Sequence, residues 1–262
     1  MLPKVSEDFD GVNLLLMTAT ISPQIGVPGL AISDPLMRRR HYESAVTRML
    51  RDVGPGRPFS RLIFAENSGS DLSSIPGVVK RGGAVGRVEL LSLPGDASDA
   101  IHGRGFGEFK LVDRAMESSE SILARGPEVR IWKLTGRYAL LNAKPIVSSF
   151  PPEADFYVDL KKYPMRWVDL RVFGFTKSGH ASFAKGLYSA LSEHADRVPP
   201  EMKLFEHWSV HTNRNRFHQR FRCEPLLSGV RGVDGKSYLN GVGVIKYVTR
   251  RIVRRFVPRL WI

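Results

Sequence analysis

The N-terminal half of the chain alternates short apolar runs with polar turns and amphipathic segments, and this alternation limits its possible folds. Mostly apolar runs predict buried strands at Asn13 to Thr18, Arg61 to Ala65, Val88 to Leu93 and Val129 to Trp132. Apolar residues at helical spacing predict helices over 35–51 and 108–123. Strands and helices in alternation predict an α/β fold, with a mainly parallel sheet flanked by helices, over roughly residues 11–145.

The second half of the chain is less regular. It contains strand-like runs at 156–160 and 168–175, a helical pattern over 178–194 and a polar, aromatic stretch over 199–222. No linker separates the halves. We therefore expect one continuous fold, with a nucleotide-binding half (1–145), an acceptor-binding half (146–243) and a tail (244–262).

Charge and cysteine content narrow the class of protein. The 262 residues include 39 Lys and Arg against 26 Asp and Glu, a formal charge of +13, which favours phosphates, acidic sugars, nucleic acid or anionic lipid as partners. The single Cys223 excludes an internal disulfide framework, and the acidic N-terminus lacks the pattern of a secretory signal. The expected location is the cytoplasm.

Polar residues follow three of the predicted strands at their carboxyl ends. They are Thr18 and Thr20, then Glu66, Asn67 and Ser68, then Lys133, Thr135 and Arg137. Open α/β sheets bind ligands at this edge, where hydroxyls and amides suit a base and ribose and cations suit a diphosphate. The alternative is that these are ordinary polar turns.

Several segments, in order, resemble bacterial glycosyltransferases of surface-polysaccharide assembly. They are Leu16-Met17-Thr18-Ala19-Thr20-Ile21, Asp34 with Arg38 to Arg40 and Tyr42, Phe64-Ala65-Glu66-Asn67-Ser68-Gly69, Gly103-Arg104-Gly105-Phe106-Gly107-Glu108 and Trp132-Lys133-Leu134-Thr135-Gly136-Arg137-Tyr138. The resemblance implies a GT-A-like (Rossmann-like) fold that binds a nucleotide sugar, with Arg39 added to the donor-binding residues. After residue 145 it thins to Gly229-Val230-Arg231-Gly232-Val233-Asp234-Gly235 with Tyr238.

The chain departs from the usual GT-A pattern at one place. Lys133 and Arg137 stand where such enzymes usually carry a metal-binding Asp-x-Asp, and the literal Asp8-Phe9-Asp10 precedes the first predicted strand. We therefore expect no metal or other cofactor, with the two cations stabilising the departing diphosphate. The alternative is that both make structural ion pairs at a turn.

Inverting transfer, which the resemblance implies, needs a base to take the proton of the acceptor hydroxyl. Glu206 is the first candidate, with Asp155 and Asp159 behind it, although carboxylates in a basic protein are often salt-bridged surface groups. His207, Trp208 and Arg214 are candidate acceptor contacts, unless their segment is an ordinary amphipathic helix packed on the sheet.

Two further patterns predict neither a metal site nor a dinucleotide site. His207 and His211 have the i, i+4 spacing of zinc ligands but no third ligand, so we expect no metal site there. The segment Gly103-Arg104-Gly105-Phe106-Gly107 lacks the spacing of a dinucleotide fingerprint, and we expect it to form a mobile loop near the donor.

The last residues predict a basic amphipathic helix, with Ile245, Val248, Ile252, Val253 and Phe256 on one side and cations mostly on the other. We expect this helix to hold the protein on an anionic membrane surface, through Arg250, Arg251, Arg254, Arg255 and Trp261. The alternative is a last helix whose apolar side docks on the core and whose arginines are solvated.

The expected function is sugar transfer from a nucleotide-sugar donor to a lipid-linked or growing surface glycan, by a peripheral protein on the inner face of the plasma membrane. Two alternatives stay open. The charge would also suit a nucleic-acid-binding protein, although no nucleic-acid module is recognisable and we expect no nucleic-acid partner. The second alternative is a transferase-like scaffold that has no catalytic turnover and holds partners at the membrane.

Overall fold

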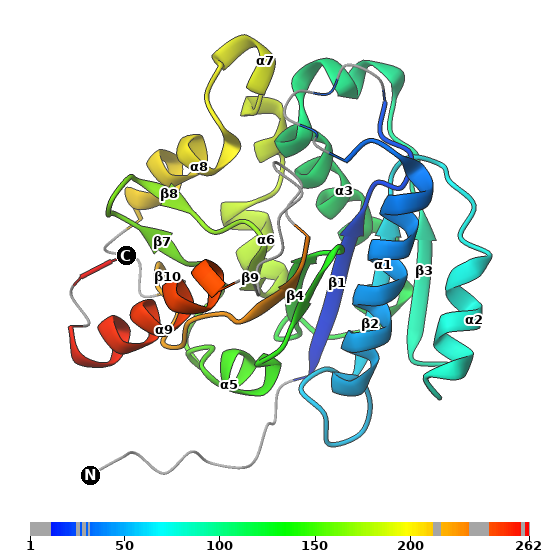
Figure 1. The fold of residues 1–262 in the computed structure, drawn as a ribbon, viewed down its shortest axis with the longest axis horizontal. Helices are drawn as coiled ribbons and strands as arrows, with labels where there is room; N and C mark the ends of the chain where they lie inside the picture. Colours follow the sequence, from blue (N-terminus) through cyan, green and yellow to red (C-terminus); the bar gives the residue numbers. More distant parts are fainter. Residues whose placement is uncertain are drawn as a thin grey trace.

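A single seven-stranded sheet, in the order β10-β6-β9-β4-β1-β2-β3, forms the centre of the protein (Figure 1). The computed structural model describes residues 12–24, 27, 30, 32–211, 216–230, 241–257 and 260–261. The strands of the sheet are β1 (Asn13–Ala19), β2 (Arg61–Glu66), β3 (Val88–Ser92), β4 (Arg130–Thr135), β6 (Phe156–Tyr157), β9 (Val172–Phe175) and β10 (Phe217–His218). Two short antiparallel pairs lie outside it, β5 (Tyr138–Leu140) with β11 (Leu227–Gly229) and β7 (Leu160–Lys161) with β8 (Trp167–Val168).

The expected mainly parallel arrangement is confirmed. Strands β3, β2, β1 and β4 run parallel, β9 pairs antiparallel with both β4 and β6, and β10 is parallel to β6. Because β1 is central and buried along its whole length, its sequence is almost continuously apolar. The sheet contains strands from before and after residue 145, so the segments 1–145 and 146–243 share one sheet.

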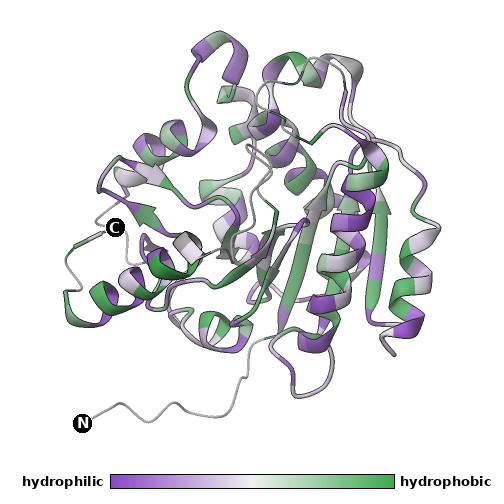
Figure 2. Cartoon of the chain, viewed as in Figure 1, coloured by the Kyte–Doolittle hydropathy of each residue, from purple (hydrophilic) through white to green (hydrophobic). Residues whose placement is uncertain are grey.

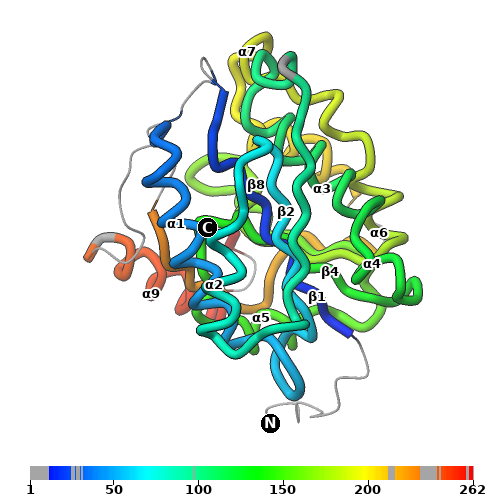
Figure 3. Tube along the Cα trace, turned by 90° about the vertical axis from the view of Figure 1, so that its right-hand side faces the viewer, coloured from blue at the N-terminus to red at the C-terminus, as the bar shows by residue number. Residues whose placement is uncertain are grey.

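Helices cover both faces of the sheet, as Figure 3 shows with α1 and α2 on one side and α3, α4 and α6 on the other. They are α1 (Pro35–Met49), α2 (Ser74–Arg81), α3 (Arg104–Ser118), α4 (Glu120–Leu123), α5 (Ala143–Ser148), α6 (Lys177–Phe183), α7 (Glu193–Asp196), α8 (Pro200–Ser209) and α9 (Gly241–Phe256). Alternate residues of β1 enter different cores. Leu15 and Met17 pack with α1, α2 and α5, whereas Leu14 and Leu16 pack with α3, α6 and α8.

Two expectations about helices were wrong. The glycine-rich segment 103–107 is not a loop, because α3 begins at Arg104 and includes it. The pattern over 178–194 is not one helix: α6 ends at Phe183, and Gly186, with φ +75°, starts the 3-10 helix Leu187–Ala190 before α7. The first difference matters for the site, since it carries Glu108 to the end of the sheet.

The C-terminal helix is present as expected, and its apolar side faces away from the body of the protein. Arg254 is buried, while the apolar side chains of Ile245, Ile252 and Phe256 are exposed. The alternative of an apolar face docked on the core is therefore wrong. Among the described residues, no helix is long and apolar enough to span a bilayer.

Candidate functional site

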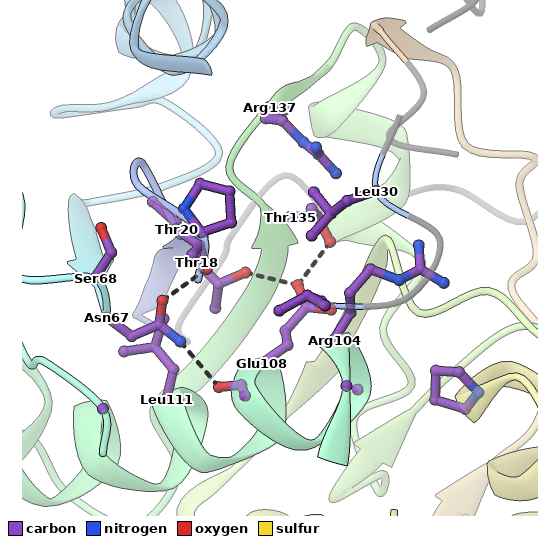
Figure 4. Close-up of a pocket in the computed structure, with 18 of the residues that line it drawn as sticks. Thr18, Thr20, Leu30, Asn67, Ser68, Arg104, Glu108, Leu111, Thr135 and Arg137 are labelled. Atoms are coloured by element: carbon purple, nitrogen blue, oxygen red, sulfur yellow. Dashed lines mark hydrogen bonds between the residues drawn. The ribbon is translucent and has the colours of Figure 1, made fainter. Parts of the chain in front are cut away.

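A pocket of about 300 Å³ lies at the carboxyl ends of β1, β2 and β4 (Figure 4). Its wall is completed by the start of α3, the segment after β8 and the start of α8. The predicted donor residues that line it are Thr18, Thr20, Asn67, Ser68, Thr135 and Arg137. Three strand ends therefore converge on one cavity, as the parallel sheet requires.

Glu108 organises the floor of this pocket. One oxygen, Oε1, accepts hydrogen bonds from the hydroxyls of Thr18 (2.8 Å) and Thr135 (2.9 Å), which belong to β1 and β4. The same oxygen lies 2.6 Å from Nζ of Lys133. Burial opposes ionisation of Glu108, but the Lys133 ammonium and the two hydroxyls outweigh it and hold the pKa of this carboxyl below its usual value.

Lys133 does not point into the open pocket. Its side chain is fully buried, and Nζ also donates to Oγ1 of Thr135 (2.9 Å) and to the carbonyl oxygen of Leu170 (2.7 Å). Burial lowers the pKa of Lys133, an effect that Glu108 partly offsets. The direct phosphate contact predicted for Lys133 is therefore replaced by a structural ion pair, the alternative considered for this turn.

Arg137 is placed differently, in the turn between β4 and β5. Its Nε and Nη1 atoms are buried and have no hydrogen-bond partner among the described residues. Figure 4 shows the guanidinium directed toward the pocket. The turn is tight because Gly136 donates its N–H to the Thr18 carbonyl, and a Cβ at Gly136 would lie 2.6 Å from that oxygen. An anion in the pocket would satisfy the two nitrogens.

A second hydrogen-bond network holds the loops above β1 and β2. Thr20 donates to Oδ1 of Asn67 (2.6 Å), and Asn67 donates to the carbonyl of Gly107 (3.3 Å). Glu66 is fully buried and accepts from the backbone N–H groups of Ile21 and Ser68, both at 2.9 Å. Glu66 therefore shapes the pocket without lining it.

Arg39 does not line the pocket, whereas its neighbour Arg38 does. Arg38 is buried, and its guanidinium donates to the carbonyls of Thr20 (2.6 Å) and Ile32 (3.1 Å) and to the Tyr42 hydroxyl (3.1 Å). One step along a helix turns a side chain by about 100°. Hence the neighbour, and not Arg39, faces the sheet, where it braces the loop after β1.

The three predicted catalytic carboxylates do not line the pocket. Glu206 is exposed on α8. Asp155 is buried and accepts from Thr176 (2.9 Å) and Arg216 (2.9 Å), at the start of α6. Asp159 is fully buried and pairs with Arg254. The structure uses both aspartates to join segments of the fold.

The predicted acceptor residues also lie elsewhere. Trp208 is fully buried in the core, where its Nε1 donates to the Phe183 carbonyl at 2.9 Å. His207 is exposed on α8, and Arg214 lies outside the described residues. The amphipathic-helix alternative therefore accounts for this stretch: Trp208 continues the apolar stripe of Leu204 and Phe205.

Glu201 is a pocket residue that the sequence did not reveal. It stands in the first turn of α8, where its carboxylate accepts a hydrogen bond from its own backbone N–H, and it forms no ion pair within the described parts of the chain. Burial raises the pKa of Glu201 above its usual value, with the nearby Glu193 and Glu108 adding to the rise and Arg104 opposing it. Glu201 lies five residues, about 140° of helix rotation, from Glu206.

The remaining carboxylates at the pocket are neutralised by cations. Lys110 binds Asp96 (2.7 Å) and Asp99 (2.8 Å). Asp169 accepts from Nε of Arg171 at 2.7 Å, and although burial opposes its ionisation, Arg171 and Lys161 hold its pKa well below the usual value. No group of three or more His, Cys, Asp or Glu among the described residues could hold a metal ion.

Comparisons with known proteins were made by sequence and by structure. No family model matches the chain, and no curated protein matches it. A 4-diphosphocytidyl-2C-methyl-D-erythritol synthase structure is similar over 92% of this chain and 99% of its own, with 10% identity and a TM-score of 0.43. The glycosyltransferase GlyE of Streptococcus pneumoniae TIGR4 is similar over 80% of this chain and 45% of its own, with 8% identity and a TM-score of 0.46. At these values the likeness says nothing about chemistry.

Proposed function

We propose that the protein transfers a sugar from a nucleotide-sugar donor to a glycan acceptor, at the pocket where β1, β2 and β4 end. The observation that carries this proposal is that two buried nitrogens of Arg137 have no hydrogen-bond partner within the described ranges and line the same pocket as the polar groups of Thr20 and Asn67. A guanidinium with free donors suits a diphosphate, and hydroxyl and amide groups suit a base and ribose.

Within this proposal Arg137 stabilises the departing diphosphate. The charge that develops on the leaving phosphate oxygens is stabilised by a donor that is already in place and pays no reorganisation cost. Lys133 acts indirectly, because it neutralises Glu108 and thereby removes a negative charge that would repel the diphosphate.

We further propose that transfer needs no divalent ion. Among the described residues, four of the five carboxylates that line the pocket are held by cations, Asp96 and Asp99 by Lys110, Asp169 by Arg171 and Glu108 by Lys133, and Glu201 alone is too few ligands to hold such an ion. Transfer that continues in excess EDTA would support this, whereas strict dependence on added Mn²⁺ or Mg²⁺ would contradict it.

We propose Glu201 as the proton acceptor for the acceptor hydroxyl, in place of Glu206. Glu201 lines the pocket with no cationic partner within 4 Å among the described residues, and its raised pKa makes it a stronger base than an exposed carboxylate. In this scheme the hydroxyl proton passes to Glu201, the acceptor oxygen bonds to the anomeric carbon and the nucleoside diphosphate leaves. Inversion at the anomeric carbon follows from a single such displacement.

We also propose an acceptor and a cellular location. A growing surface glycan, carried on lipid at the inner face of the plasma membrane, is the proposed acceptor. The exposed apolar side chains and exposed cations of α9 support a peripheral attachment.

The donor part is tested by a thermal-shift screen of the full chain against sugar nucleotides, with and without divalent ions. A ligand that binds the folded form raises the unfolding temperature by mass action. We expect one class of nucleotide sugar to raise it in the wild type and to have a much smaller effect on Arg137→Gln. The matched control is Arg51→Gln, since Arg51 is exposed and outside the pocket. A screen without any shift, together with tight binding of duplex DNA at moderate salt, would favour a nucleic-acid-binding protein instead.

A further inference from the structure

Helix α9 is fixed to the body through charge. The guanidinium of Arg254 donates to Glu224 (2.6 Å), to Asp159 (2.9 Å) and to the Phe221 carbonyl (2.7 Å), all in buried surroundings. Leaving these two carboxylates without their partner would be costly, so the helix keeps Arg254 inward. The lipid contact predicted for Arg254 is thereby replaced by an internal ion pair, and Arg250 likewise approaches Glu224 at 3.7 Å.

This attachment turns the apolar side of α9 outward. Its exposed apolar side chains are Val244 and the series Ile245, Val248, Ile252 and Phe256, which recurs every three or four residues, and all five are 43–72% exposed. Figure 2 shows hydrophobic positions along the whole helix. A stripe of this kind on an isolated protein marks a surface for a partner.

A second exposed segment lies beside the end of this helix. The tip of the β7–β8 hairpin, residues 162–166, is exposed throughout, with Tyr163 at 65% and Met165 at 55%. The backbone N–H groups of Lys162 and Tyr163 both donate to the carbonyl of Trp261, at 2.9 and 3.0 Å. Arg254 of α9 also pairs with Asp159, the residue that precedes β7. The Trp261 ring is also occupied, because Nζ of Lys162 lies 4.1 Å from its centre.

Both segments carry cations and no acid. Residues 162–166 contribute Lys162 and Arg166, and α9 contributes the exposed Lys246, Arg251 and Arg255. Neither segment contains Asp or Glu. A second copy of the chain would bring like charges together, whereas an anionic bilayer attracts each cation by about 1 kcal/mol and accepts the apolar side chains.

We propose that the β7–β8 hairpin tip and the outward face of α9 together form one surface that docks on an anionic bilayer. Two adjacent elements bind more firmly than the helix alone, because their buried apolar areas and their charges add. Tyr163 and Met165 insert beside Phe256, while Arg166, Arg251 and Arg255 remain at the level of the headgroups.

The hairpin also connects this surface to the pocket. Strand β8 leads from the tip directly to Trp167, Asp169 and Arg171, which line the pocket beside β4, where the backbone N–H of Thr135 donates to the Arg171 carbonyl at 2.8 Å. An acceptor sugar held on a membrane lipid therefore reaches the pocket from the docked side, with the Trp167 ring available for stacking. This statement about the acceptor rests on the proposed function, whereas the docking surface does not.

Vesicle sedimentation of the full chain tests the surface without any catalysis. Wild-type protein is expected to partition about 30-fold or more in favour of vesicles containing phosphatidylglycerol over pure phosphatidylcholine, because at least two cations at the surface each contribute about 1 kcal/mol. Tyr163→Ser with Met165→Ser, and separately Ile252→Ser with Phe256→Ser, should each lower partitioning about tenfold or more. Arg166→Gln should lower it about fivefold, the equivalent of one surface cation.

The matched control is Val85→Ser with Leu123→Ser, two side chains that are 72% and 56% exposed and lie outside both segments. It should bind vesicles like the wild type. The unfolding temperature of each variant checks folding, since all the altered side chains are exposed. Hairpin variants that bind like the wild type, or wild-type binding that is equal on neutral and anionic vesicles, would overturn the proposal. So would a wild-type dimer that does not bind vesicles and that the hairpin variants dissociate.

The acceptor is tested separately, with the labelled sugar nucleotide that the thermal-shift screen selects. Incubation with inner-membrane vesicles should give label that is extractable into organic solvent, and the hairpin variants should give about tenfold less. Label that appears only in water-soluble glycan would overturn the lipid-linked acceptor and leave the docking result intact. Absence of transfer, with normal vesicle binding, would count against the proposed function alone.

Discussion

The fully buried Lys133 forms an ion pair with the partly exposed Glu108, 2.6 Å between Nζ and Oε1, at the floor of the pocket. The pair joins β4 to α3, and the hydroxyls of Thr18 and Thr135 complete the coordination of the carboxylate. The positive charge of Lys133 is consequently neutralised within the protein. Arg137, at the next turn of the chain, keeps donors for an anion.

The Lys133–Glu108 pair should be strongly coupled in stability. Glu108→Gln leaves the Lys133 ammonium buried without a counter-charge, and we expect a loss of about 3–5 kcal/mol in the free energy of unfolding. The double variant Lys133→Met with Glu108→Gln should recover much of this loss, because no buried charge is left unpaired. Urea unfolding of the single and double variants measures the coupling. Additive losses would show that the two groups do not act as a pair.

Arg137→Gln should weaken donor binding more than it weakens the fold. A charge-assisted hydrogen bond contributes about 1.5–3 kcal/mol, so we expect the dissociation constant of the bound sugar nucleotide to rise about 10- to 100-fold. The free energy of unfolding should fall by only about 1 kcal/mol, the contribution of the hydrogen bond with Tyr138, since the Nε and Nη1 atoms have no partner to lose among the described residues. Titration calorimetry gives the first quantity and urea unfolding the second. An unchanged dissociation constant would remove Arg137 from the donor site.

Glu201→Gln should abolish most turnover and leave sugar-nucleotide binding intact. The general base acts in its ionised form, and burial raises the pKa of Glu201. The acid limb of the profile of kcat/KM against pH should therefore lie above the value of about 4.3 for an unperturbed glutamate. Glu206→Gln on the same helix is the matched control, and its profile should equal that of the wild type. Lost turnover in the control with normal turnover in Glu201→Gln would restore the original assignment.

The sheet could be predicted from the sequence because the sequence of a buried parallel strand is a nearly continuous run of apolar residues. All four runs in the N-terminal half became strands, and their polar ends became the pocket. The glycine-rich segment 103–107 was interpreted as a loop on the basis of local propensity. Tertiary packing overrides that preference: Gly105 is buried in α3, and a Cβ there would lie 2.5 Å from Pro200. Glycine is needed at this point for the close approach of α8.

The roles of individual charges could not be predicted, because charge pairing depends on contacts far apart in the sequence. Glu108 is 25 residues from Lys133, and Asp159 is 95 residues from Arg254. The amphipathic pattern of α9 was recognisable, but not which side would face the body. That choice depends on buried Asp159 and Glu224, which attract Arg254 inward. Glu201 carried no sequence signal beyond its place after Pro200.

Tyr157 should make stability fall in alkaline solution. Its ring is fully buried on β6, its hydroxyl accepts from the backbone N–H of Arg222 at 2.7 Å, and burial raises its pKa to about 12. In the unfolded chain the pKa is about 10, so the unfolded state releases the proton first. The stabilisation is complete below about pH 10. Above that pH the free energy of unfolding should decrease by about 1.4 kcal/mol per pH unit up to pH 12.

Tyr157→Phe removes this titrating group, so its stability should decline less steeply than that of the wild type over the same interval. Urea unfolding at pH 9, 10 and 11 measures the two slopes. Tyr163→Phe is the matched control, because the Tyr163 side chain is 65% exposed at the hairpin tip. The control should decline as the wild type does, since it leaves the buried Tyr157 hydroxyl in place. Equal slopes for the wild type and Tyr157→Phe would mean that the buried hydroxyl ionises as readily as a solvated one, contrary to its position among Phe150, Trp132 and Phe221.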